Sequence, residues 1–296
     1  MSPISQAAFI SKFNYLREKR PYLFIVALLA ILLVTLLFIP WLLTSLNMND
    51  YLPALIGEVC ACAVAVLFLN WLDWWGDLGY TAPLQSQDSH LFAIPILFVV
   101  FPSLVALLVL VARGSLQVPP ADICYFVLQA LLIAFLEETY YRGFILQALL
   151  PRGILLAVFS SALFFTFAHI GSTFSALDGF SLCTEILFTL GWGCVFAALW
   201  LRTGAIWPLI VLNCLHNFCD LIVHENQGGL VAFVSQTYAW TIWSSLCFAL
   251  ILLGYSFWLL RPLRIQSLHN RYFPLPHDAS PPDTPAEPSE YSSPRN

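Results

Sequence analysis

The chain has 296 residues, of which 59% are hydrophobic and only 10% are charged, and its formal net charge is -5. Its mean hydropathy is +0.80. A soluble domain of this length needs many more polar side chains to cover its core, and a nucleic-acid-binding protein needs a basic surface. The composition therefore excludes both classes and indicates a protein that crosses the lipid bilayer several times.

The amino-terminal segment, residues 1–21, contains the basic run KFNYLREKR just before the first apolar stretch. Lys and Arg beside a membrane span favour the cytosolic side, so this segment is expected in the cytosol. The first apolar stretch is too long for a signal peptide and lacks a small-residue cleavage site. We therefore expect it to remain as a membrane anchor.

Apolar stretches long enough to cross about 30 Å of hydrocarbon as helices recur along the chain. They predict an all-α fold, a multi-pass transmembrane helical bundle over residues 22–262 with about eight spans. With eight spans, both termini are expected to be cytosolic, because the basic residues that follow the first span fall on the side of the amino terminus, except for Arg113. These residues are Arg152, Arg202, Arg261 and Arg264. The expected spans are Tyr22–Leu46, Tyr51–Leu72, Leu91–Ala112, Ile123–Leu150, Ile154–Ile170, Leu182–Leu201, Ala205–Val223 and Tyr238–Leu260.

The carboxyl-terminal segment, residues 263–296, has a different composition. It is rich in Pro, Ser and acidic residues and has few large apolar side chains. Such a segment cannot bury enough apolar surface to fold. We expect a disordered cytosolic tail.

The sequence LEETYYRG places two carboxylates and an arginine inside the fourth expected span. Ionisable side chains at membrane depth are costly and are usually functional. Glu138 and Arg142 stand four residues apart, so they can form an ion pair on one face of the helix. Glu137 points about 100° away from Glu138 and has no obvious local partner, which makes it a candidate general base or acid. The alternative is a purely structural cluster of polar side chains between helices.

Two more expected spans carry polar side chains. FFTFAHIG places His169 near the end of the fifth span. In the seventh span, VLNCLHNFCD contains Asn213, His216, Asn217 and Asp220. Counted from the nearest cytosolic turns at 1.5 Å per residue, Glu137, His169 and His216 lie at depths of about 22, 25 and 18 Å. Three helices are therefore expected to bring one carboxylate and two imidazoles to one layer.

This combination of side chains is suited to hydrolysis. A glutamate and a histidine beside a water can accept its proton and make it a nucleophile for a peptide carbonyl. A second histidine with an amide neighbour can donate hydrogen bonds to the developing oxyanion. Glu137, His169 and His216 could instead hold zinc, so a metal-activated water stays an alternative. The chain contains neither a G-x-S-x-G serine elbow nor an H-E-x-x-H helix.

Two other acidic residues, Glu58 and Glu185, lie in apolar spans. Each stands near the expected outer end of its helix. We interpret both as residues of the membrane interface, in contact with water.

Three motifs together resemble those of the CPBP family, which includes CAAX prenyl protease 2 and bacteriocin-processing intramembrane proteases. EETYYR, Glu137–Arg142, is similar to its E-E-x-x-x-R motif, and FTFAH, Phe165–His169, to its F-x-x-x-H motif. RTGAIWP followed by HNFCD resembles its third signature, H-x-x-x-N or H-x-x-x-D after an R-T-G-x-x-W-P lead-in. The resemblance covers residues 123–223, which we expect to form a protease-like core.

The resemblance implies an intramembrane endopeptidase. By it, Glu137 and His169 activate the water, and His216 with Asp220 forms the oxyanion site. Glu138 and Arg142 are implied to brace the helix, with no metal or other cofactor in the favoured glutamate-type mechanism. The implied substrate is a peptide or protein reached from the membrane or the cytosol, with no nucleic-acid partner. A prokaryotic cell membrane is the expected location, ahead of the endoplasmic reticulum.

The third signature departs from the family pattern. The family histidine stands where this chain has Asn213, so an ungapped match pairs Asn213 with Asn217. We prefer His216, because its depth fits Glu137 better and HNFCD keeps the internal spacing. An ionised Asp220 would repel an oxyanion, so it would have to be protonated or paired with His216. A non-enzymatic scaffold, chaperone or immunity protein on the same fold is the alternative function.

Overall fold

The computed structural model describes residues 19–46, 51–112, 114, 118–173, 179–225 and 227–261. Within these residues the regular elements are all helical, which confirms the expected all-α class. The expected disordered tail, residues 263–296, and most of the segment before the first helix lie outside the described residues.

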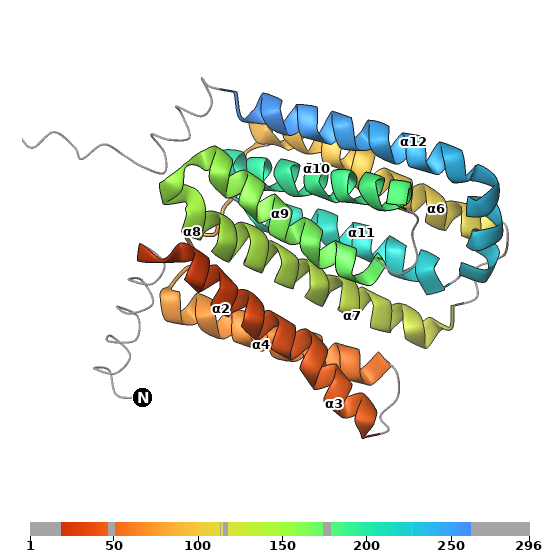
Figure 1. Cartoon of the computed structure of the whole chain (residues 1–296), viewed down its shortest axis with the longest axis horizontal. Coiled ribbons are helices and arrows are strands. Elements are labelled where there is room, and N and C mark those ends of the chain that lie inside the picture. The colour runs from red at the N-terminus through yellow and green to blue at the C-terminus, as the bar shows by residue number, and fades with distance from the viewer. Residues whose placement is uncertain are drawn as a thin grey trace, which may run out of the picture. The chain divides into compact units, whose positions relative to one another are not determined.

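The described residues form sixteen helical elements. Figure 1 shows how the main helices are arranged. Several long helices contain a π-helical or 3-10 segment, labelled η. The elements are α2 (Pro21–Leu33), η1 (Val34–Phe38), α3 (Ile39–Ser45), α4 (Tyr51–Leu72), η2 (Ser86–Phe92), α5 (Ala93–Pro95), η3 (Ile96–Val100), α6 (Phe101–Ala112), α7 (Pro120–Glu137), η4 (Glu138–Leu146), α8 (Gln147–Leu149), η5 (Leu150–Arg152), α9 (Ile154–Thr173), α10 (Gly179–Thr203), α11 (Trp207–Glu225) and α12 (Gln227–Leu259).

Five helical segments of the described chain are long and apolar enough to cross a membrane. They are Pro21–Ser45, Tyr51–Leu72, Ser86–Ala112, Asp122–Arg152 and Leu182–Thr203. The shorter apolar helices are Ile154–His169, Trp207–Val223 and Trp243–Leu259. Each of the eight expected spans overlaps one of these segments. Length and composition alone support five crossings and a membrane protein.

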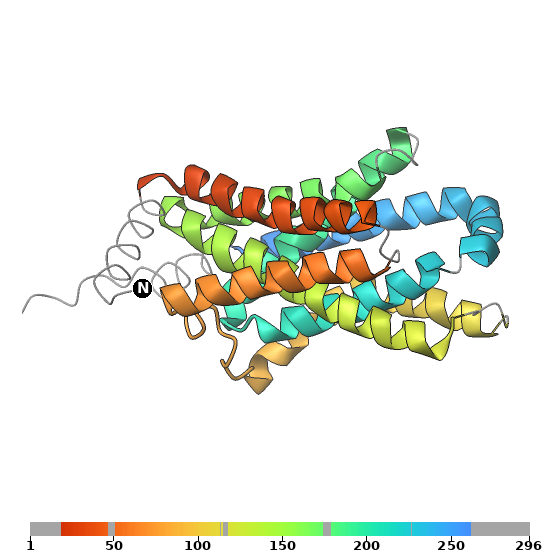
Figure 2. The ribbon, with the colours of Figure 1, turned by 90° about the horizontal axis from the view of Figure 1, so that it is seen from below.

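The central helix of the bundle is α10. It packs between α9 and α12 and also contacts η4 (Figures 1 and 2). Residues 191–201 of α10 are all buried, which is unusual for a helix that could face lipid. Gly193 allows the close approach to α9, since a Cβ added there would lie 2.9 Å from the Cα of Ala162.

A second group of helices forms around α11, which packs against α7 and α6. The helix α4 in turn packs against α7, and it crosses η1 and α3 on its other side. This crossing is close because Gly57 has no side chain: a Cβ there would lie 2.8 Å from the Thr35 carbonyl oxygen and from Pro40. The helices that carry the three sequence motifs, α7, α9 and α11, are therefore held by direct packing.

The loop between α4 and η2, residues 73–85, docks against the start of α11. The backbone N–H of Ile206 donates to the Gly79 carbonyl at 3.3 Å, and the Trp207 indole donates to the Ala82 carbonyl at 2.9 Å. Both Gly79 and Gly204 have positive φ, at 75° and 67°. A Cβ at Gly79 would lie only 1.8 Å from the Gly204 carbonyl oxygen. The glycine of the R-T-G lead-in thus meets a second glycine from a distant loop.

The same loop reaches the motif on η4. The Tyr80 hydroxyl lies 2.5 Å from Thr139 Oγ1, and Thr139 donates to the Phe135 carbonyl. Because Thr139 uses its one proton on Phe135, Tyr80 is the donor of the pair. Burial raises the pKa of Tyr80, so this hydroxyl stays protonated. The loop therefore links the R-T-G segment to the E-E-x-x-x-R segment.

Candidate active site

The motif EETYYR begins where α7 changes from α-helical to π-helical geometry. The π-helical segment η4 spans Glu138–Leu146, and all of its nine residues are buried. Ser161 of α9 donates its hydroxyl to the Tyr141 carbonyl at 2.7 Å, which gives this backbone acceptor a partner outside its own helix. Single π-helical turns are rare and occur frequently at functional sites.

The ion pair expected within the motif is present. Arg142 Nη1 lies 3.0 Å from Glu138 Oε1, and both side chains are fully buried. The guanidinium also lies over the ring of Phe165, 4.5 Å from its centroid, and 5.3 Å from the centroid of Phe196. These cation–π contacts stabilise a charge that has no access to water. The pair fixes η4 against α9 and α10.

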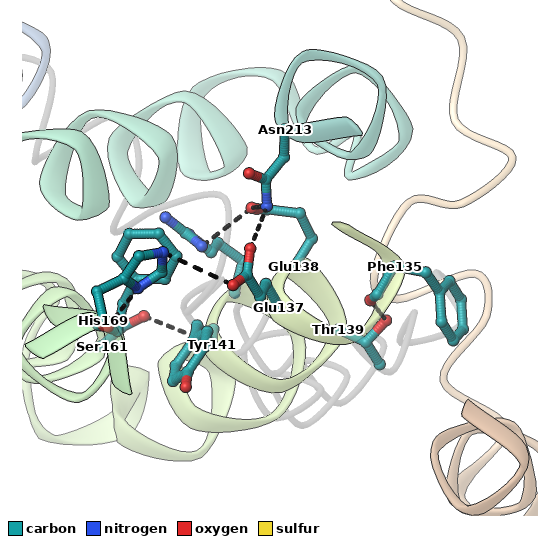
Figure 3. A network of polar contacts seen from close by, with 10 residues as sticks. Phe135, Glu137, Glu138, Thr139, Tyr141, Ser161, His169 and Asn213 are labelled. Atoms are coloured by element: carbon teal, nitrogen blue, oxygen red, sulfur yellow. Dashed lines mark hydrogen bonds and ion pairs between the residues drawn. The ribbon is translucent and has the colours of Figure 1, made fainter. Parts of the chain in front are cut away.

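Asn213 of α11 joins the two neighbouring carboxylates (Figure 3). Its Nδ2 atom lies 2.8 Å from Glu137 Oε2 and 3.1 Å from Glu138 Oε1. A single amide group can donate both hydrogen bonds because it carries two hydrogens. The position of Glu137 on its helix had indicated no local partner, but the structure gives it one in Asn213. The two hydrogen bonds of Asn213 also offset the repulsion between the adjacent acids.

His169 of α9 faces the other oxygen of Glu137 (Figure 3). Its Nε2 atom lies 3.7 Å from Glu137 Oε1, and its Nδ1 atom lies 3.0 Å from the Phe165 carbonyl oxygen. A carbonyl only accepts, so Nδ1 carries a proton and Nε2 of the neutral ring is an acceptor. Two acceptors thus face each other beyond direct hydrogen-bonding distance. A water between them can donate one proton to each.

A cavity of about 230 Å³ adjoins this pair. It is large enough for several waters or for part of a substrate. Asn217 is one of its polar residues, and its Nδ2 atom is buried without a hydrogen-bond partner in the described part of the chain. An unpaired amide donor beside a glutamate and a histidine is a candidate oxyanion donor. The lining residues are Ile133, Glu137, Ala168, His169, Asn217, Asp220 and Leu221.

His216 makes different contacts from those that depth counting indicated. Its Nδ1 atom lies 2.8 Å from Ser103 Oγ of α6, and its ring meets Trp192 edge-on at 4.4 Å between centroids. The residue of α11 that reaches the Glu137 carboxylate is Asn213, three positions earlier. Within the described residues His216 makes no hydrogen bond or ion pair with Glu137, and its role in the oxyanion site stays a prediction.

The zinc alternative has no support from the donor geometry. Over the described ranges, no group of three His, Cys, Asp or Glu side chains is placed to hold one metal ion. Glu137, His169 and His216 are thus not arranged as the set of ligands that a catalytic zinc requires.

Sequence reasoning missed three side chains that shape the site. Ser161 supports η4, Ser103 binds His216, and Trp192 lies between the two histidines, with ring centroids 6.1 Å from His169 and 4.4 Å from His216. A serine or tryptophan in an apolar helix carries no signal of its own. Only the packing of α6, α9 and α10 gives these residues their partners.

The fold and the site together define a helical membrane protein with a buried polar cluster of two glutamates, an arginine, a histidine and an asparagine. Residues 119–219 match the family described as type II CAAX prenyl endopeptidase Rce1-like. Over these residues the chain is similar to this family of CAAX-type proteases, which agrees with the resemblance to the CPBP family that the three motifs indicated. Comparisons with curated proteins and with solved structures gave no match.

Proposed function

We propose that the protein is an intramembrane endopeptidase in which Glu137 and His169 activate a water for attack on a peptide carbonyl. The observation that carries this proposal is the pair of acceptors, Glu137 Oε1 and His169 Nε2, at 3.7 Å beside a cavity. A water that donates to both has its lone pairs free to attack. Asn213 holds the second oxygen of Glu137, so the carboxylate keeps one orientation. The proposed mechanism requires no metal.

For the oxyanion, we propose Asn217 as the donor in place of His216. Asn217 lines the cavity, and its amide nitrogen has no other partner among the residues that the structure describes. This choice agrees with the ungapped match to the family, which pairs Asn213 with Asn217. Asp220 lines the same cavity and is exposed, so it can bind water or a substrate amide at the rim.

For the topology, we propose eight crossings with both termini in the cytosol. The start of α2, just after Arg20, and the ends of η5 and α10, which carry Arg152 and Arg202, lie at the same end of the bundle (Figure 1). This arrangement agrees with the rule that places Lys and Arg on the cytosolic side. The site lies between this end and the opposite one, within reach of substrates from the membrane or the cytosol. A prokaryotic cell membrane is the proposed location.

The test of the proposed function is the substitution Glu137→Gln in cells that otherwise lack the protein. It removes the general base but keeps the side chain's size and its hydrogen bond to Asn213, so the protein should remain folded and lose activity by about 10²–10⁴-fold. Quantitative proteomics of peptide termini should then reveal a precursor that accumulates uncleaved. Asp122→Asn, at the other end of α7, is the matched control and should leave cleavage unchanged.

Other outcomes favour the alternatives. The set of peptide termini could be identical in three kinds of cells: those with the unmutated protein, those with Glu137→Gln and those without the protein. That result would favour a non-enzymatic scaffold, chaperone or immunity protein. Cleavage that stops with a chelator and returns with stoichiometric zinc would favour a metal-activated water.

A further inference from the structure

A second, larger cavity of about 520 Å³ reaches Glu137 from the side of the first helix. We call it the lateral groove. Its walls are mostly leucine and phenylalanine side chains of α2, η1 and α9. Glu58 and Glu137 are its acidic residues. The complete lining is Leu29, Leu32, Leu33, Leu36, Leu37, Ala54, Glu58, Ile133, Leu136, Glu137, Tyr141, Phe164, Phe167 and Ala168.

Glu58 is not an interfacial residue, contrary to its expected position near a helix end. Its exposed fraction is 7%. One carboxyl oxygen, Oε1, accepts a hydrogen bond from Gln129 Nε2 at 3.1 Å, and no ion pair involves it within the described chain. The other oxygen, Oε2, is buried with no partner in the same residues. A residue that lines a groove and holds a buried polar atom without a partner is a candidate ligand-binding residue.

The chemistry of the groove distinguishes two kinds of occupant. Its apolar walls suit hydrocarbon chains and apolar side chains equally. A hydrocarbon chain, however, has nothing to bind to Glu58 Oε2. An extended peptide in a bilayer must find partners for its backbone N–H and C=O groups, because lipid offers none. Because Gln129 already binds Oε1, Oε2 is the oxygen of Glu58 left to pair with one backbone group of such a peptide.

We propose that Glu58, held by Gln129, is a substrate subsite that hydrogen-bonds the backbone of an extended apolar peptide segment in the lateral groove. Since the same groove reaches Glu137, this contact sets which peptide bond meets the activated water. Glu58 is thus a specificity-determining residue outside the segment matched to the protease family. The inference rests on the proposed endopeptidase function for its role in cleavage, but binding of the peptide can be measured without it.

The test uses the full-length protein in phosphatidylcholine vesicles with a dye-labelled Leu–Ala peptide that carries one photoreactive leucine. All variants contain Glu137→Gln, so that binding is measured without hydrolysis. Glu58→Leu should reduce crosslinking about tenfold, which is the effect of losing one well-formed hydrogen bond. Glu58→Gln keeps a donor and an acceptor and should retain most of the crosslinking. Variants are compared at equal amounts of monodisperse protein with equal thermal stability.

Two neighbouring positions on α4 provide a second pair that does not depend on the folding of Glu58→Leu. Ala54→Trp fills the groove and should also reduce crosslinking, whereas Val59→Trp, at a lipid-exposed position, should not. Full crosslinking by Glu58→Leu would overturn the proposed subsite. So would labelling of the groove by a photoreactive fatty acid that the peptide does not displace. Glu58-dependent crosslinking without any cleavage by the unmutated protein would contradict the proposed function alone.

Discussion

The side-chain amide of Asn213 lies 2.8 Å from a carboxylate oxygen of Glu137, although 76 residues separate them in the chain. The same nitrogen binds Glu138. Two adjacent acids in an apolar helix are thereby held by one donor from another helix. The contact joins α11 to α7 and η4 at the point where the proposed chemistry takes place. Asn213 is therefore both a packing residue and a residue that orients Glu137, the proposed general base.

Asn213→Ala should impair both activity and stability. The substitution leaves the buried Glu138 and the partly exposed Glu137 without their shared donor, and an unsatisfied buried group costs about 1–3 kcal/mol. Turnover should fall about 10²-fold, because Glu137 loses its fixed orientation. Both effects can be measured from cleavage of the accumulated precursor and from thermal unfolding in detergent. Cys214→Ala, the next residue on α11, is the control. Equal values for the two variants would contradict an orienting role for Asn213.

The buried pair of Glu138 and Arg142 predicts strong coupling between the two residues. Arg142→Leu alone leaves an uncompensated carboxylate with no exposure to water, and should lower the free energy of unfolding by about 3–5 kcal/mol. Glu138→Gln alone leaves Arg142 without its counter-charge. The double variant should be more stable than the sum of the two losses predicts. Each single change leaves one buried charge without its partner, whereas the double change removes both charges. Additive losses in a double-mutant cycle of unfolding would show that the ion pair is not coupled.

Much of the helical framework could be predicted because it depends on local composition. Runs of apolar residues such as Tyr51–Leu72 are bounded by polar or turn residues, and the observed α4 has these same limits. The ion pair of Glu138 and Arg142 could also be predicted, since it depends only on a spacing of four residues. Both properties are set within one helix and need no knowledge of its neighbours.

The arrangement of the site could not be predicted in the same way. Depth counting considered only the rise along each helix, so it could not show that the side chain of α11 that hydrogen-bonds the Glu137 carboxylate is Asn213. The contact of Gly79 with Gly204 depends on a loop that folds back over more than one hundred residues. Glu58 was assigned to the interface from its position in α4 alone. The sequence of α4 gives no sign of the hydrogen bond that Glu58 accepts from Gln129 of α7. Such contacts are set by tertiary packing.

Gly79→Ala should destabilise the protein much more than Gly76→Ala in the same loop. Gly79 has a φ of 75° and its added Cβ would lie 1.8 Å from the Gly204 carbonyl oxygen, whereas a Cβ at Gly76 meets nothing within 4 Å. Backbone strain alone costs about 1–3 kcal/mol, and the loop must also move away from Gly204. Gly76→Ala should change stability by less than about 0.5 kcal/mol. Thermal unfolding of the two variants in the same detergent measures the difference, and similar midpoints would mean that the loop does not dock on the R-T-G segment.

The last prediction decides which residue of VLNCLHNFCD acts on the oxyanion. Because Asn217 lines the cavity with a free amide donor, Asn217→Ala should lower kcat about 10²–10³-fold with little change in KM. Asp220→Asn should keep activity or raise it, since an amide at the rim of the cavity donates without adding negative charge.

His216 is the competing candidate, and its contact with Ser103 provides the control. If its role is to join α6 to α11, His216→Gln and Ser103→Ala should both reduce thermal stability and leave kcat within about tenfold of the unmutated protein. Turnover of the four variants is compared at matched amounts of folded protein. A loss of kcat in His216→Gln beside an active Asn217→Ala would show that the histidine, and not the amide one residue later, stabilises the oxyanion.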